Sequence, residues 1–259
     1  MVWDECVLVR LARQPDIENV MVLRSRCRHG AALVVLVLAS ACGYREEAQE
    51  ARRVDAAPAG ERSMPTSAPV AAAERRIVVL GDSLTAGLGL SPDQAYPAIL
   101  QQRLNERGLG YTVVNAGVSG DTSAGGLSRL DWALDGDVRV LIVALGGNDA
   151  LRGLPVAELE RNLSRIIERA QARKITVVLA GMEAPPNYGR DYTAAFHQVY
   201  TKVAQKYRVA LVPFLLINVA GHRRLNQPDG IHPTAEGARV VADNVWAVLR
   251  PIVERTPRD

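Results

Sequence analysis

The stretch RIVVLGDSL, residues 76–84, decides the fold, because a short apolar run stops at a glycine, an aspartate and a serine. Comparable apolar runs, rich in β-branched residues, recur at residues 111–115, 138–145, 175–181 and 209–213. Runs of this length and composition are typical of buried β-strands. The sequence therefore predicts five buried strands.

The segments between these runs have helical periodicity. Apolar residues recur every three or four positions over residues 127–134, 155–170, 192–203 and 234–249. Asp121 is the expected N-cap of the first of these helices. Near-continuous apolar strands that alternate with single helices are typical of a parallel sheet covered by helices on both faces. Ligands of such sheets bind beyond the carboxyl ends of the strands, so we expect the functional site in the loops there.

Composition and charge exclude several classes of protein. The chain has 259 residues, of which 48% are hydrophobic and 23% charged, close to the values of ordinary globular proteins. These values fit neither a polytopic membrane protein nor a wholly disordered chain. The formal charge is +3 and the arginines are scattered, so no nucleic-acid partner is expected. All three cysteines lie in the first 42 residues, which excludes a disulfide framework or a cysteine zinc site in the rest of the chain.

Residues 1–42 have the layout of an export signal. A basic stretch precedes an uncharged run at residues 31–41, which is too short to span a membrane as a helix. The run ends in small residues before Cys42, which resembles a bacterial lipobox and predicts lipidation of this cysteine. A cleaved soluble signal and a buried core segment are the alternatives. Residues 1–20 carry four acidic side chains, which suits no export signal, so we expect translation to start at Met21.

The segment that follows, residues 43–75, is rich in Ala, Pro, Arg and Glu and poor in large apolar residues. Such a segment buries too little apolar surface to offset the entropy lost on ordering. We expect a disordered linker, with a charged surface helix over residues 46–54 as the alternative. The predicted domains are therefore an extension with an export signal at residues 1–42, this linker, and a folded domain at residues 76–255.

Four loops carry polar motifs at the predicted strand ends or helix starts. They read GDSLTAG at residues 81–87, NAGVSGDT at residues 115–122, GGND at residues 146–149 and DGIHP at residues 229–233. Glycine beside aspartate or asparagine is also what ordinary turns require. The joint occurrence of the four motifs at one edge of a parallel sheet indicates a single functional site.

The residue types in these loops suit hydrolysis of an acyl bond. Ser83 lies in a tight strand-to-helix turn and is the candidate nucleophile. His232 is the candidate base, and Asp229 can hold the second imidazole nitrogen. The backbone N–H groups of Ser83 and Gly120 and the side-chain amide of Asn148 are the candidate donors to an oxyanion. The sequence therefore predicts a serine hydrolase.

The same motifs resemble those of the SGNH (GDSL) hydrolase superfamily: GDSL around Ser83, then Gly120, GGND around Asn148 and DGIHP around His232. The similarity extends over residues 76–252. Further stretches, NAGVSGDTSAGGLSRL, LGGNDALRGL and PPNYGRDY, resemble the bacterial branch of multifunctional thioesterase I, lysophospholipase and arylesterase enzymes. The resemblance implies an α/β fold of three layers, α/β/α, with a five-stranded parallel sheet in the order 2-1-3-4-5 and flavodoxin-like topology.

The resemblance also implies roles for individual residues. Ser83 is the implied nucleophile, Asp229 and His232 complete the triad, and Gly120 and Asn148 join Ser83 in the oxyanion hole. No cofactor or metal is implied. The expected substrate is a small-molecule acyl ester, thioester or lipid that is cleaved through an acyl-enzyme. With the export signal, we expect a monomer in the periplasm or on the bacterial envelope, touching a membrane only through its lipid anchor.

Other functions fit parts of the pattern. A catalytically silent lipoprotein could bind acyl chains or glycans on the same fold, and a carbohydrate O-acetyl esterase is a further alternative. A nucleotide or flavin binder is disfavoured, because the chain has no G-x-x-x-x-G-K-[ST] and no G-x-G-x-x-G after its first strand. Metal-assisted hydrolysis by Asp149, Asp229 and His232 is the last alternative.

The loops after the third and fourth strands are expected to form the wall of an acyl pocket. Leu151, Leu154 and Ala184 are apolar enough to contact a hydrocarbon chain. Asn187 and Tyr188 follow two prolines and either line the pocket or merely turn the chain.

Several other polar and aromatic residues are expected to have structural roles. Asp82 and Asp149 flank motif residues and are expected to cap and brace turns. His197 falls on an apolar-patterned helix and is expected to be packed or surface-exposed. Trp132 and Trp246 are at helix positions and are predicted to belong to the core.

Overall fold

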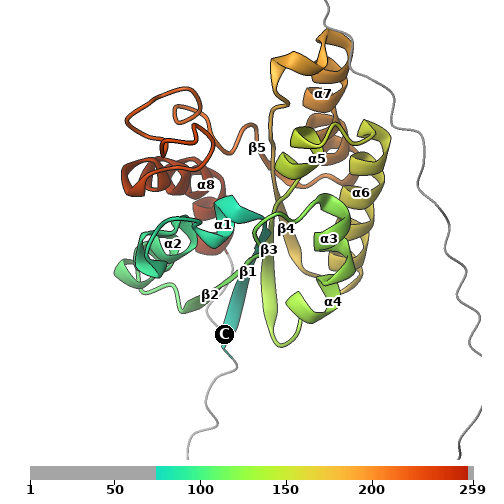
Figure 1. Ribbon diagram of the computed structural model, residues 1–259. Coiled ribbons are helices and arrows are strands. Elements are labelled where there is room, and N and C mark those ends of the chain that lie inside the picture. The colour runs from blue at the N-terminus through green and yellow to red at the C-terminus, as the bar shows by residue number, and fades with distance from the viewer. Residues whose placement is uncertain (1–73, 256–259) are drawn as a thin grey trace, which may run out of the picture. The chain divides into compact units, whose positions relative to one another are not determined.

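A parallel sheet of five strands runs through residues 74–255, the part of the chain that this computed structural model describes (Figure 1). The strands lie in the order β2-β1-β3-β4-β5, and every neighbouring pair is parallel. Their bounds are β1 Arg75–Gly81, β2 Tyr111–Gly117, β3 Val138–Ala144, β4 Thr176–Ala180 and β5 Ala210–Val212. The predicted fold and strand order are confirmed, and each strand lies within two residues of its predicted run.

Helices cover both faces of the sheet (Figure 1). Helices α2 and α8 pack together on one face, and α3, α6 and α7 lie on the other. The helices are α1 Ser83–Ala86, α2 Tyr96–Glu106, α3 Ser123–Ser128, α4 Leu130–Ala133, α5 Gly147–Leu151, α6 Val156–Ala172, α7 Arg190–Tyr207 and α8 Ala235–Arg255. Two 3₁₀ turns, η1 Pro92–Gln94 and η2 Pro186–Tyr188, lie in the connections. The three predicted layers are therefore present.

Helix α2 lies outside the predicted helices, although its buried residues have a helical spacing. Tyr96, Leu100 and Leu104 recur every four positions and face the core, and Pro97 occupies the first turn. The hydroxyl groups of Tyr96 and Thr85 share a hydrogen bond of 2.7 Å. Helix α2 therefore supports α1, the short helix that begins at the predicted nucleophile.

The helix predicted over residues 127–134 is instead two short helices, α3 and α4, which meet at Arg129. Arg129 has a φ of −104° and a ψ of 9°, which interrupts the helix there. The N-cap of α3 is Thr122, whose side chain accepts a hydrogen bond from the Gly125 N–H at 3.3 Å. The prediction that Asp121 is the N-cap is wrong, because its carboxylate pairs with Arg129 instead.

The core is centred on β1 and β3, where residues 77–80 and 140–145 are almost completely buried. Trp246 of α8 is buried as predicted, but the prediction for Trp132 is wrong, since this residue is 75% exposed. Helix α4 is a single turn that buries Leu130 and Ala133, and Trp132, two positions after Leu130, faces outward.

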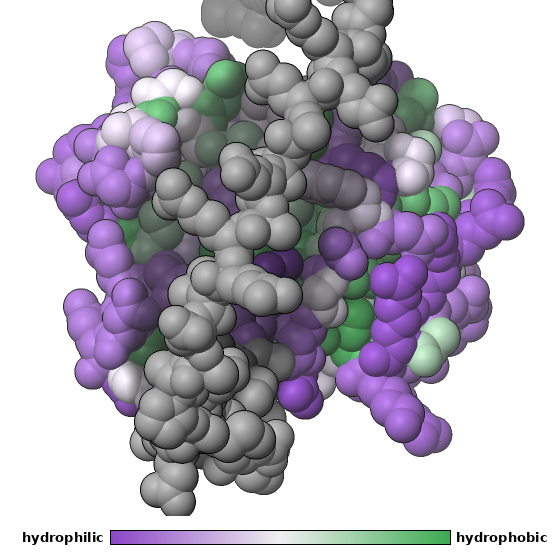
Figure 2. All heavy atoms as spheres, turned by 90° about the horizontal axis from the view of Figure 1, so that it is seen from below, coloured by the Kyte–Doolittle hydropathy of each residue, from purple (hydrophilic) through white to green (hydrophobic). Residues whose placement is uncertain are grey.

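The lower face of the molecule in Figure 1 is drawn in Figure 2, where hydrophilic residues predominate around the visible edge.

Within residues 74–255, none of the helices combines the length and the apolar composition that a membrane span needs. The predictions for residues 1–42, Met21 and Cys42 lie outside the described residues, as does most of the linker. Strand β1 begins at Arg75, one residue before the predicted domain boundary.

Candidate active site

Ser83 is the first residue of α1 and lies directly after the carboxyl end of β1. Glycine is required at position 81, because a Cβ on Gly81 would lie 1.9 Å from Thr85 Oγ1. Asp82 caps α1 by accepting a hydrogen bond from the Leu84 N–H at 3.0 Å. This local sequence therefore forms a tight turn that holds Ser83 at the carboxyl edge of the sheet.

The side chains of Ser83, His232 and Asp229 form one hydrogen-bonded chain. His232 Nε2 lies 2.8 Å from Ser83 Oγ, and His232 Nδ1 lies 2.8 Å from Asp229 Oδ2. Asp229 Oδ1 accepts hydrogen bonds from the backbone N–H groups of Ile231 at 2.9 Å and His232 at 3.0 Å. Hydrogen bonds from the His232 N–H, the His232 ring and the Ile231 N–H lower the pKa of Asp229 to about 2. An ionised carboxylate therefore faces the imidazole at neutral pH.

Gln227 ties the loop that carries His232 to the neighbourhood of the nucleophile. Its side-chain Nε2 donates to the carbonyl groups of Leu88 at 2.7 Å and Pro233 at 2.9 Å. Its backbone N–H donates to the His232 carbonyl at 2.7 Å. Since Leu88 follows α1, one glutamine joins the connection after β1 to the connection before α8.

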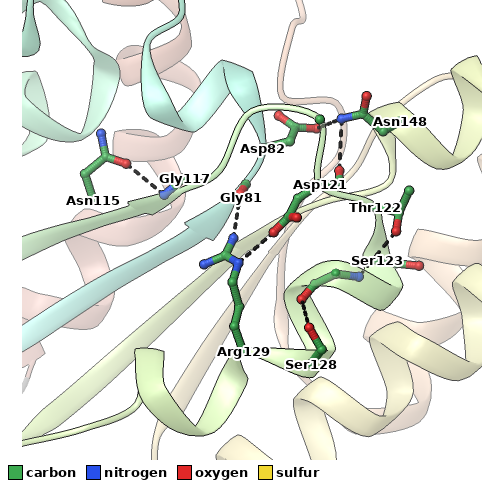
Figure 3. A network of polar contacts seen from close by, with 12 residues as sticks. Gly81, Asp82, Asn115, Gly117, Asp121, Thr122, Ser123, Ser128, Arg129 and Asn148 are labelled. Carbon is green, nitrogen blue, oxygen red and sulfur yellow. Dashed lines mark hydrogen bonds and ion pairs between the residues drawn. The ribbon is translucent and has the colours of Figure 1, made fainter. Parts of the chain in front are cut away.

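Gly120 lies on the loop after β2 and Asn148 lies in α5, which follows β3, and both line the same cavity as Ser83. Among the hydrogen bonds of the described residues, none is donated by the backbone N–H of Ser83 or Gly120. The side-chain amide of Asn148 donates to the Asp121 carbonyl at 2.9 Å and lies 3.4 Å from Asp82 Oδ2 (Figure 3). Two of the predicted oxyanion donors are therefore unengaged, and the third must release its longer contact to reach an oxyanion.

A cavity of about 540 Å³ at the carboxyl edge of the sheet contains Ser83 and His232 in its lining. This volume lies within the usual range of small-molecule sites. The wall is mainly apolar and includes Leu88, Leu151, Met182, Ala184, Phe214, Leu216 and Ile231. Met182, Phe214 and Leu216 were not predicted, because apolar residues that follow a strand cannot be told from core residues by pattern alone.

Two of the five residues predicted for the pocket wall line the cavity. These are Leu151 and Ala184, whereas Leu154, Asn187 and Tyr188 are not part of the lining. The Tyr188 hydroxyl donates to the Leu151 carbonyl at 2.7 Å, so Tyr188 contacts the wall without lining the cavity. The position of these residues depends on how the loops fold back, which the sequence pattern does not specify.

Residues 79–240 match the GDSL-like lipase/acylhydrolase family. The chain belongs to this family. It is 46% identical over 183 residues to esterase TesA of Pseudomonas aeruginosa, which covers 70% of this chain and 91% of that protein. It is 39% identical over 184 residues to thioesterase 1/protease 1/lysophospholipase L1 of Escherichia coli K12. This alignment covers 71% of this chain and 87% of that protein. The chain also resembles the crystal structure of AlinE4, an SGNH-hydrolase family esterase, with a TM-score of 0.58 and 45% sequence identity. The match covers 71% of this chain and 98% of the AlinE4 chain.

The family match confirms the predicted superfamily and the predicted enzyme class. The chain is a GDSL-type serine hydrolase that cleaves carboxylic esters or thioesters. Asp149, Asp229 and His232, the ligands of the metal-assisted alternative, do not form a cluster, and residues 74–255 contain no other group of three or more such side chains that could hold a metal. His197 is exposed and pairs with Glu183 at 2.6 Å.

Two buried carboxylates brace the active-site loops of this hydrolase, as predicted. Asp149 accepts hydrogen bonds from the Ser123 N–H at 2.8 Å and the Ser123 hydroxyl at 2.5 Å, which joins the loop after β3 to α3. Asp82 is only 3% exposed, and its burial raises its pKa from 3.8 to about 6. The folded hydrolase therefore holds a carboxylate at neutral pH in a place that favours the neutral acid.

Arg129 connects the loops after β1 and β2 (Figure 3). Its Nε donates to Asp121 Oδ2 at 2.6 Å, and its Nη2 donates to the Gly81 carbonyl at 2.9 Å. The side chains of Arg129 and Asp121 are only 17% and 18% exposed. Since the Asp121 carbonyl holds the Asn148 amide, one guanidinium fixes the position of the Ser83 turn relative to Gly120 and Asn148. Nothing in the sequence distinguishes Arg129 from the other arginines.

Replacing Arg129 with Met is expected to lower kcat by up to about 10²-fold with little change in KM, because the donors lose their relative positions while the cavity wall remains. Arg129→Lys should restore only part of kcat. The ammonium group of lysine can pair with Asp121, but it lacks the planar guanidinium whose second nitrogen donates to the Gly81 carbonyl. Steady-state kinetics with a nitrophenyl ester measures both effects.

Arg169→Met is the matched control, because Arg169 pairs with Asp131 of α4 at an exposed position. Its kcat should equal that of the wild type. A result in which Arg129→Met lowers the melting temperature but keeps kcat would reduce Arg129 to a purely structural role.

Asp82→Asn is expected to change how stability depends on pH. Folded Asp82 binds its proton more tightly than the unfolded chain does, so its contribution to the free energy of unfolding falls as pH rises from 3.8 to about 6. The difference between the two pKa values corresponds to a loss of about 3 kcal/mol in the free energy of unfolding over this pH range. The amide of the variant has no such titration, whereas the opposite effect of Asp229 is common to both proteins and cancels. Urea unfolding at pH 4, 5, 6 and 7 should show the variant gaining stability relative to the wild type across this range, and a constant difference would contradict the assignment.

Proposed function

We propose that this hydrolase cleaves its ester or thioester through an acyl-enzyme on Ser83. The observation that most supports this is the hydrogen-bonded chain from Ser83 Oγ through His232 to Asp229, with both contacts at 2.8 Å. His232 Nε2 accepts the Ser83 proton as Oγ attacks the carbonyl carbon, and Asp229 stabilises the resulting imidazolium. The imidazolium then protonates the leaving alcohol or thiol. A water molecule, deprotonated by His232, attacks the acyl-enzyme and releases the acid.

We assign stabilisation of the oxyanion to the backbone N–H groups of Ser83 and Gly120 and to the side-chain amide of Asn148. The two N–H groups support this assignment, because neither donates to another group among the described residues. For Asn148 the proposal includes one rearrangement. The amide keeps its 2.9 Å bond to the Asp121 carbonyl and exchanges the 3.4 Å contact with Asp82 for the oxyanion.

The apolar wall of the cavity supports an acyl chain or an aromatic group as the part of the substrate that is bound. The names of the relatives, esterase TesA and thioesterase 1/protease 1/lysophospholipase L1, support the same class of substrate. An acetylated carbohydrate is a less suitable substrate, because its hydroxyl groups would lose water and face the apolar side chains of Leu88, Leu151 and Phe214 without hydrogen-bond partners there. A non-catalytic binding protein would have no need for the contact between Ser83 and His232.

We propose further that the chain is exported and held at the bacterial envelope by a lipid on Cys42, with residues 43–75 as the linker. The support for this is the basic stretch, the uncharged run and the small residues before Cys42. In that compartment lysophospholipids and other lipid esters are better candidate substrates than acyl-CoA. A monomer is sufficient for this function, because one chain supplies Ser83, Asp229 and His232.

Labelling with a fluorophosphonate is expected to add one phosphonyl group to Ser83. The serine oxygen attacks phosphorus and fluoride leaves, so the adduct reports an activated hydroxyl. Peptide mass spectrometry should locate the adduct on the peptide that contains Ser83 and find none in Ser83→Ala. Ser119→Ala is the matched control, since Ser119 also lines the cavity and should leave the labelling intact. An adduct that persists in Ser83→Ala would assign the nucleophile elsewhere.

Asn148→Ala should lower kcat by roughly 10²–10³-fold with little effect on KM, as expected for a donor that acts in the transition state. Asn105→Ala offers a comparison, because Asn105 is exposed near the end of α2 and its side-chain oxygen accepts a hydrogen bond from Gln101 Nε2 at 2.8 Å. Kinetics with a series of nitrophenyl esters gives both parameters. A tenfold rise in KM at unchanged kcat would instead make Asn148 a residue that binds the ground state.

A further inference from the structure

Exposed large apolar side chains gather at one edge of this hydrolase. Among residues 74–255 seven such side chains are exposed, and only Trp132, on α4 ahead of β3, lies away from the connections that follow the strands. The other six, which we call the apolar rim, are between 39% and 48% exposed: Leu88, Val118, Leu151, Tyr188, Ile217 and Ile231. Single exposed hydrophobic residues are ordinary on a soluble protein, but a group of six at one edge calls for an explanation.

The apolar rim belongs to the mouth of the active-site cavity. Leu88, Leu151 and Ile231 line the cavity itself. Val118 and Ile217 do not line it, but each is adjacent in sequence to a residue that does. The rim residues come from the connections after all five strands, at the upper edge of the sheet in Figure 1. The face seen in Figure 2 is the opposite one, and hydrophilic residues predominate at its edge.

Cationic side chains border the apolar rim. Arg152 is exposed and donates from Nη2 to the Gly120 carbonyl at 2.8 Å. A second hollow, which shares Asn226 and Gly230 with the cavity, has Arg223 in its lining. The carboxylate of Glu183 in the cavity wall is engaged by a histidine ring at 2.6 Å. Apolar side chains bordered by cations are typical of protein surfaces that lie on phospholipid.

The occupant of the rim has to leave the cavity open to substrate. A protein partner seated there would cover the entrance, and no ester could reach Ser83 while the complex lasted. A lipid layer would cover the same side chains and would present acyl chains at the entrance. We therefore propose that the apolar rim inserts into the surface of a phospholipid layer, and that ester substrates pass from this layer directly into the cavity.

This inference rests on the proposed function and extends it from dissolved esters to esters held in a lipid phase. The test uses the full chain with Cys42→Ser in every variant, so that a lipid on this cysteine cannot anchor the protein. The variant Val118→Ser/Ile217→Ser removes two rim side chains that do not line the cavity. Flotation with vesicles of phosphatidylcholine and phosphatidylglycerol measures binding. Hydrolysis is measured on dissolved nitrophenyl acetate and on lysophosphatidylcholine incorporated in the same vesicles.

We expect the double variant to bind vesicles roughly 100-fold less tightly than the wild type, about tenfold for each apolar side chain withdrawn from lipid. Hydrolysis of the vesicle-bound ester should fall with binding, while kcat/KM for nitrophenyl acetate stays unchanged. Trp132→Ser removes an even more exposed apolar side chain away from the rim, and it should bind vesicles and cleave both substrates like the wild type.

Three results would overturn the proposal. The double variant could float with vesicles like the wild type, Trp132→Ser could lose as much binding, or sedimentation without lipid could show a dimer that only the double variant lacks. The last result would make the rim an interface between two copies of the chain. Ser83→Ala should float like the wild type, so vesicle binding is read independently of catalysis. A wild type that binds vesicles but leaves nitrophenyl acetate intact would count against the proposed function instead.

Discussion

The hydrogen bond between Ser83 Oγ and His232 Nε2 joins two residues that are 149 positions apart in the chain, and proton transfer between them requires this short distance. Ser83 begins α1 and His232 lies on the loop before α8, so only the complete fold brings their side chains together. Strand β1 lies between β2 and β3, which brings the loops after three strands to one place. Gln227 then ties the histidine loop to the connection after α1. The stability of the parallel sheet is therefore a condition for the chemistry at its edge.

The loops around this hydrogen bond are held by groups that weaken the fold locally. Asp82 carries a charge in a buried position, and burial raises its pKa to about 6. Arg129 is largely buried, and its Nη1 has no hydrogen-bond partner. Replacing such groups with apolar ones often stabilises a protein, so their presence is best explained by the geometry that they impose. Both groups act on the Asn148 amide. The Asp82 carboxylate lies 3.4 Å from it, and Arg129 pairs with Asp121, whose carbonyl accepts a hydrogen bond from it.

The sequence predicts well what depends on local pattern and poorly what depends on the path of the chain in space. The strands and Ser83 follow from β-branched runs that end at polar loops, and Asp229 and His232 follow from a polar motif directly before the last helix. Asp121 was expected to cap a helix by a local rule, but the ion pair with Arg129 competes for its carboxylate, and Thr122 caps α3 instead. Trp132 was expected in the core because it is large and apolar, but it lies two positions from Leu130, on the side of α4 that faces away from the core. The contacts of Gln227 could not be foreseen, because they join residues that are brought together only by the complete fold.

The same short loops carry both the polar groups of the active site and the apolar groups at its mouth. Val118 lies two positions from Gly120, Leu151 three positions from Asn148, and Ile231 next to His232. Residues so close in sequence share one backbone, so a movement that displaces an apolar side chain at the entrance also displaces a polar group beneath it. Since electrostatic interactions strengthen when water is excluded, whatever covers these apolar side chains acts on the charges around Ser83 as well. The entrance to the cavity and the polar groups around Ser83 are therefore built from the same short loops.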